Sequence, residues 1–134
     1  MVLVLVLIAP FVVIPVNGVA KWDGGCIVLG VVDGDTIRMN CPRSDISRGR
    51  ILGYDAPEGW GGCFAERWGS VKAMAVLHWA LLRAGRIEAT THGLDRYGRV
   101  LVRVSLDGAD LSDRMTDAGV ARPYGGGRRQ GWCG

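Results

Sequence analysis

The sequence predicts a small five-stranded β-barrel, with one main helix between the third and fourth strands and a short helix after the fifth. The length of 134 residues is that of one domain. Short segments rich in β-branched residues, several alternating between apolar and polar, lie on both sides of one long segment rich in Ala and Leu. Turn signals containing Gly or Pro separate these segments.

The first three strands follow from residues 27–54. Residues 27–32 are a β-branched apolar run, Asp33-Gly34 is a hairpin turn signal, and residues 36–39 return as the partner strand. Residues 48–54 form the third strand. It ends at Asp55-Ala56-Pro57, because proline has no N–H to donate to a neighbouring strand. Proline also keeps the residue before it out of the helical conformation.

The main helix is predicted over residues 65–82, with Gly85 as its stop and with Trp68 and Trp79 in the core. Residues 86–91 and 100–104 alternate as half-buried strands. Residues 110–118 form the short helix, with Asp110 as N-cap and Gly119 past its end. This is the element order of the five-stranded OB barrel, a common scaffold for binding nucleic acid.

The N-terminal segment differs from the rest of the chain. Residues 1–16 are apolar and uncharged, and Gly18-Val19-Ala20 has the small-x-small form of a signal peptidase site, so residues 1–20 are interpreted as a secretory signal. The missing Lys or Arg leaves an uncleaved anchor or a misassigned start as alternatives. A membrane span needs about 20 apolar residues and rarely contains two prolines, here Pro10 and Pro15. We therefore expect a secreted or periplasmic domain, residues 21–134, with no stable membrane association after cleavage.

Four cysteines in a chain with an export signal predict two disulfides. No Cys-x-x-Cys pair is present, which argues against a zinc site. Four cysteines allow 3 connectivities. The hairpin pairing favours Cys26 opposite Cys41, which leaves Cys63 to hold the C-terminal tail through Cys133.

Three separated segments carry the chemistry: Val31 to Thr36, Arg50 to Glu58, and Asp95 to Arg99. They contain three aspartates, whose hard carboxylate oxygens suit Ca²⁺, and two arginines, whose rigid forks match phosphate oxygens. The formal net charge of +3, carried mostly by arginine, agrees with a phosphate ligand. Charge alone does not show that the chain binds nucleic acid. Glu58 remains as a candidate base.

These segments resemble the thermonuclease (staphylococcal-nuclease-like) family, in register from about residue 28 to about residue 122, as in a small secreted bacterial-type member. The resemblance implies a Ca²⁺-dependent endonuclease that hydrolyses DNA and RNA with little sequence preference and leaves 3′-phosphate ends. It implies that Asp35 and Asp55 bind Ca²⁺ with the backbone carbonyl of Ala56, and with Asp33 in support. Ala56 stands where the best-known members have threonine, which a main-chain ligand tolerates.

The resemblance also implies a catalytic trio, Arg50, Glu58 and Arg99, in which the glutamate orients or deprotonates the attacking water. The expected nucleic-acid contacts are Arg96, Tyr97 and Tyr124. The Arg128-Arg129 pair is interpreted as part of a solvated basic tail, and the protein is expected to be a monomer. The alternative functions are a catalytically inactive OB-fold nucleic-acid-binding module and, less favoured, a structural exported domain. Binding alone would not require Glu58.

Overall fold

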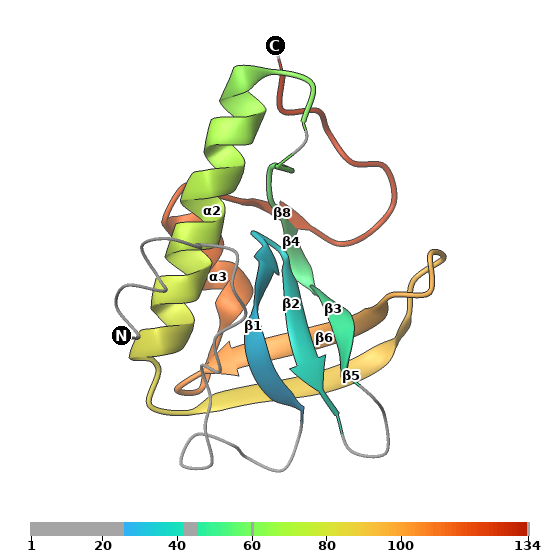
Figure 1. Cartoon of the computed structure of the whole chain (residues 1–134), viewed down its shortest axis with the longest axis vertical. Coiled ribbons are helices and arrows are strands. Elements are labelled where there is room, and N and C mark those ends of the chain that lie inside the picture. The colour runs from blue at the N-terminus through green and yellow to red at the C-terminus, as the bar shows by residue number, and fades with distance from the viewer. Residues whose placement is uncertain (1–25, 42–45, 60, 134) are drawn as a thin grey trace.

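The computed structural model of the chain describes residues 26–41, 46–59 and 61–133. The expected signal peptide, residues 1–20, lies outside the described residues. Most of the strands belong to one mixed sheet, formed by β1 (Ile27–Asp33), β2 (Thr36–Asn40), β3 (Ile46–Ile51), β6 (Val100–Leu106) and β5 (Ile87–Leu94) in that order, with β7 (Ala109–Asp110) on β6. Every pair in this sheet is antiparallel except β3 and β6. In Figure 1, β1 to β3 run steeply across β5 and β6, so the sheet is strongly twisted.

The predicted succession of strands is confirmed, but the prediction that they close into a barrel is not. The strands make a six-stranded mixed sheet whose main path ends at β1 and β5. Those two end strands share no ladder in the described part of the chain. A single backbone hydrogen bond, from Cys26 N to Ala89 O at 3.0 Å, links the start of β1 to β5.

The predicted third strand is divided in two. Gly53, with φ of 102°, turns the chain out of β3 into a separate short strand, β4 (Gly53–Asp55). This strand pairs with β8 (Arg122–Tyr124) of the C-terminal tail in a two-stranded sheet. The pairing fixes the tail against the segment that contains Asp55.

Helix α2 (Phe64–Arg83) buries a narrow face made mostly of small and aliphatic residues: Ser70, Ala73, Leu77, Ala80 and Leu81. Trp68 and Trp79 are 53% and 60% exposed, so the prediction that they lie in the core is wrong. Where this face meets the β1–β2 turn its side chains are small, namely Ser70 and Ala73, and both tryptophans lie off the buried face. Helix α3 (Leu111–Asp117) begins as predicted at the N-cap Asp110, whose side chain accepts a hydrogen bond from Ser112 N.

The core lies between the twisted sheet and the two helices, with Tyr54, Ile37 and Leu77 among its fully buried side chains. Both predicted disulfides, Cys26–Cys41 and Cys63–Cys133, are present, and such bonds fit an oxidising compartment. Within the part of the chain that the structure describes, no helix has the length and apolar character to cross a membrane.

Candidate active site

The turn between β1 and β2 presents two of the predicted carboxylates, Asp33 and Asp35. Gly34, between them, does not have a left-handed φ. A glycine is needed there for steric reasons, because a Cβ would lie 2.7 Å from Ala73 Cβ and 2.9 Å from Ala56 Cβ. The turn is also held from the other side, since Tyr54 Oη donates to Gly34 O at 2.8 Å. Tertiary contacts thus fix both aspartates on the folded sheet.

Asp35 and Asp55 are buried carboxylates that meet the same guanidinium group. Asp35 Oδ1 accepts from Thr36 Oγ1 at 3.1 Å, and its Oδ2 accepts from Ala56 N at 3.2 Å. Asp55 is 3% exposed, and its Oδ1 is buried with no hydrogen bond of good geometry, although it contacts two arginines. That oxygen is therefore placed to meet a cation.

Arg50, 6% exposed, is the first of these arginines. Its Nη1 donates to the carbonyls of Ile51 and Tyr54 at 2.8 and 3.1 Å. Nη1 lies 3.5 Å from Asp35 Oδ2, and Nη2 lies 3.5 Å from Asp55 Oδ1. The planar fork is thus fixed by four oxygen contacts, an arrangement that a lysine could not reproduce.

Asp33 lies beside this pair and faces the helix. Its Oδ1 accepts from Gly34 N at 2.9 Å and from Ser70 Oγ of α2 at 3.2 Å. Burial and the neighbouring charges of Asp35 and Glu58 raise the pKa of Asp33 despite these hydrogen bonds. Burial, with a smaller contribution from Asp55, likewise raises the pKa of Asp35, against the opposing effect of Arg50. The acidic groups therefore repel one another at this point.

Glu58 lies at the surface edge of the same cluster. The preceding Pro57 is buried, and a Cβ on Gly69 of α2 would come within 2.9 Å of Pro57 Cγ, so a glycine in the helix allows the loop to pack closely. The backbone N–H of Glu58 donates to Glu66 Oε2 at 3.3 Å, while its own side chain is 36% exposed. The carboxylate of Glu58 is thereby held near the aspartates but open to solvent.

Arg129 is a site residue that the sequence interpretation missed. Its Nη2 lies 2.5 Å from Asp55 Oδ1, and its Nη1 donates to Glu58 Oε1 at 2.8 Å. Burial alone would lower the pKa of this guanidinium, but the two carboxylates raise it well above its usual range. The sequence interpretation placed Arg129 in a solvated basic tail; the residue is exposed, but its guanidinium also pairs with Asp55 and Glu58. The neighbouring Cys133 was the available indication, since its disulfide returns the tail to the start of α2.

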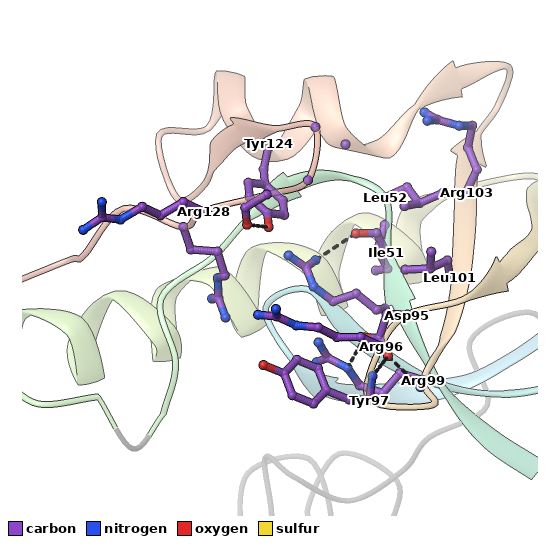
Figure 2. A pocket seen from close by; sticks show the side chains of 16 residues that line it. Ile51, Leu52, Asp95, Arg96, Tyr97, Arg99, Leu101, Arg103, Tyr124 and Arg128 are labelled. Atoms are coloured by element: carbon purple, nitrogen blue, oxygen red, sulfur yellow. Dashed lines mark hydrogen bonds and ion pairs between the residues drawn. The ribbon is translucent and has the colours of Figure 1, made fainter.

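A pocket of about 1060 Å³ opens beside this cluster, and Arg50, Arg99 and Arg129 all line it. In Figure 2, Arg96, Tyr97 and Arg99 come from the β5–β6 hairpin on one side, and Tyr124 and Arg128 come from the tail on the other. Its charged lining residues are six arginines and a single acid, Asp95; the arginines are Arg50, Arg96, Arg99, Arg103, Arg128 and Arg129. Such a lining suits an extended anion.

Two of the predicted nucleic-acid residues sit near the catalytic candidate Arg99. Asp95 Oδ2 accepts from Arg99 Nε at 2.7 Å, which orients the guanidinium. Tyr97 is 71% exposed, and its ring lies 5.1 Å from the guanidinium carbon of Arg96 and 5.8 Å from that of Arg99. The ring of Tyr124 lies 5.9 Å from the guanidinium carbon of Arg50. Aromatic faces and arginines therefore line both sides of the pocket.

The carboxylates are close but not gathered around a single point. In the described ranges, one set of three residues has potential metal-ligand atoms all within 4.8 Å of one another, namely Cys63, Glu66 and Cys133. Its two sulfurs are joined in a disulfide and cannot act as thiolate ligands. Around Asp55, two arginines stand where a metal ion would be expected: Arg50 links it to Asp35, and Arg129 links it to Glu58.

The site residues predicted from the sequence thus fall into two adjoining sets that share Arg50. Arg96, Tyr97, Arg99 and Tyr124 line the pocket with Arg50, whereas the acidic cluster contacts Arg50 and Arg129 and does not line the pocket. No protein-family model matches the chain, and no curated protein sequence gives a significant match to it.

Proposed function

We propose that this chain is a Ca²⁺-dependent endonuclease that hydrolyses the phosphodiester bonds of DNA and RNA, with little sequence preference, and leaves 3′-phosphate ends. The observation that carries the proposal is the position of Arg50. Its guanidinium contacts both Asp35 and Asp55 and lines the same pocket as Arg99. A phosphate-binding fork is thereby joined to the two acids of the expected metal site.

The chemistry of phosphodiester cleavage agrees with this set of groups. Negative charge grows on the nonbridging oxygens during attack, and guanidinium forks stabilise it by charge-assisted hydrogen bonds. Arg50 and Arg99 would supply those forks from two different walls of the pocket. Glu58, solvent-accessible and linked to Asp55 through Arg129, would orient or deprotonate the attacking water.

The donor chemistry of the acidic cluster fits Ca²⁺. The side-chain donors are hard oxygens, they repel one another, and the buried Asp55 Oδ1 already attracts two guanidinium cations. Asp35 and Asp55 would hold the ion with the main-chain oxygen of Ala56, and Asp33 would support them. When bound, the ion would supply positive charge for the phosphate oxygens.

Other features support the finer parts of the proposal. The sheet order, with its parallel β3–β6 pair and the bond from Cys26 to Ala89, agrees with an OB-type barrel that is incompletely closed. Arg96, Tyr97 and Tyr124 line the pocket and would contact phosphates and stacked bases. Two disulfides agree with secretion or a periplasmic location, and we propose a monomer.

The second candidate is an OB-fold module that binds nucleic acid without cutting it. It is favoured by the hydrogen bond that Arg129 donates to Glu58, because this bond engages the carboxylate that would otherwise act as the base. Incubating the protein with single-stranded DNA in Ca²⁺, and in parallel with a Ca²⁺ chelator, separates the two. The nuclease proposal requires fragments with 3′-phosphate ends in Ca²⁺ and intact DNA in chelator. Retention of intact DNA under both conditions, with binding detected, would favour the module.

A further inference from the structure

The segment that contains Arg129 is fixed at both of its ends. On one side, β8 pairs with β4, which places Tyr124 opposite Gly53. On the other side, Cys133 is bonded to Cys63 at the start of α2. Figure 1 shows the tail (red) leaving β8 in a wide loop and returning to that end of the helix (green). Residues 125–132 therefore form a strap rather than a free tail.

Contacts with Arg122 of β8 restrain the strap further. Arg122 donates to Gly131 O at 2.9 Å and to Gln130 Oε1 at 3.3 Å. The guanidinium carbon of Arg122 also lies 3.6 Å from the centre of the Trp132 ring. These contacts hold the three residues that follow Arg129 against β8, so its side chain is presented to the acidic cluster at a high effective concentration.

The position of Arg129 conflicts with a metal ion at Asp55. The guanidinium contacts Asp55 Oδ1, the buried oxygen that otherwise has only the more distant Arg50. The same guanidinium also donates a hydrogen bond to the carboxylate of Glu58, the candidate base. Two cations that compete for one buried oxygen cannot both be bound at full strength, because each removes the negative charge that attracts the other.

We propose that Arg129 is a built-in competitor of Ca²⁺ for Asp55, and that the Cys63–Cys133 disulfide keeps it in place. This inference rests on the proposed function and adds a regulatory contact to that site. Displacement of Arg129 frees Asp55 for the ion and Glu58 for water in the same movement. The strap thus makes the fully assembled site dependent on the Ca²⁺ concentration.

Replacing Arg129 with glutamine removes the positive charge and keeps a polar side chain, which ends before the position of the Nη atoms that contact Asp55 and Glu58. We expect the Ca²⁺ dissociation constant of R129Q to fall by about 5- to 150-fold, the usual range for coupling between two binding events. R128Q is the matched control: it removes the same charge from the adjacent position, and Arg128 is exposed. Its dissociation constant should stay much closer to that of the wild type.

The measurement is calorimetric titration of CaCl₂ into the metal-stripped protein, with circular dichroism to check that each variant is folded. The double variant C63S/C133S releases the strap and leaves Cys26–Cys41 intact. It should also bind Ca²⁺ more tightly, and adding R129Q to it should give little further gain. Such nonadditive increases in Ca²⁺ affinity would show that the Cys63–Cys133 disulfide and Arg129 act together.

The outcomes separate this inference from the function on which it rests. Equal Ca²⁺ affinity, or weaker affinity, of R129Q relative to the wild type would overturn the competitor role and leave the metal site in place. Absence of Ca²⁺ binding by both proteins would overturn the metal assignment itself, and the inference with it. Binding by R129Q alone would be the strongest form of the expected result.

Discussion

The hydroxyl of Tyr54 donates a 2.8 Å hydrogen bond to the carbonyl oxygen of Gly34, across a sequence separation of 20 residues. Tyr54 is fully buried on β4, next to Asp55, while Gly34 lies between Asp33 and Asp35 in the β1–β2 turn. This bond therefore ties the two acidic segments of the candidate site to each other. The relative positions of their carboxylates depend on the packed core.

Tyr54→Phe tests that connection. The substitution keeps the buried ring but leaves the Gly34 carbonyl without its side-chain donor, so the free energy of unfolding should fall by about 1–3 kcal/mol. Urea unfolding measures the change. Tyr97→Phe is the control, because Tyr97 is 71% exposed, and its stability should match the wild type. Equal stability of the two variants would show that the bond contributes nothing to holding the turn.

Gly34→Ala tests the contact between the turn and helix α2. The added Cβ would lie 2.7 Å from Ala73 Cβ and 2.9 Å from Ala56 Cβ, so the turn must move away from the helix, at a cost of about 1–3 kcal/mol. Gly62→Ala is the control, since a Cβ there meets nothing within 4 Å. Thermal unfolding should show a lower midpoint for Gly34→Ala alone. An unchanged midpoint would mean that the turn adapts without strain.

The sequence was informative wherever a local pattern determines the structure. An Asp-Gly pair after an apolar run predicted the β1–β2 hairpin, and Asp110 before an apolar segment predicted the start of α3. The hairpin register in turn gave the correct Cys26–Cys41 disulfide. Glycine is required in this turn because a Cβ on Gly34 would lie 2.7 Å from Ala73 Cβ, a contact with a distant segment that the Asp-Gly signal does not show.

The features that were missed depend on contacts between distant segments. No local pattern shows that residues 122–124 pair with β4, or that Arg129 reaches Asp55 and Glu58. The apolar character of Trp68 and Trp79 indicated the core, but both lie off the buried face of α2, which has small residues where it meets the turn and leucines elsewhere. The composition of a helix does not show which of its faces a neighbouring turn will approach.

Asp110→Ala tests the N-cap of α3 and should cost about 1 kcal/mol of stability at neutral pH. Burial would raise the pKa of Asp110, but hydrogen bonds from Ser112 and Arg103 outweigh it and lower the pKa below its usual value. The carboxylate's contribution is therefore complete above pH about 3.8 and is lost as the pH falls through the lowered pKa of the folded state.

Unfolding of Asp110→Ala and wild type by urea at pH 7 and at a series of acidic pH values measures this dependence. The difference between the two proteins should shrink as the solution becomes more acidic. Asp117→Ala, at the opposite end of α3, should cause no comparable loss, because an acidic side chain there is unfavourable to the helix dipole. A difference that is constant over the whole pH range would argue against a role for the ionised cap.

Glu58→Gln tests the candidate base. The change keeps the size of the side chain but removes the charge that could activate water, so turnover on single-stranded DNA should fall by roughly 10²-fold or more. The affinity for DNA should change little, because Glu58 offers no positive charge to phosphate. Glu88→Gln makes the same chemical change on β5, beside Arg86 and away from the pocket lining, and should cut at the wild-type rate. Single-turnover cleavage, with DNA binding measured in parallel, compares the three proteins, and undiminished cleavage by Glu58→Gln would remove this residue from the mechanism.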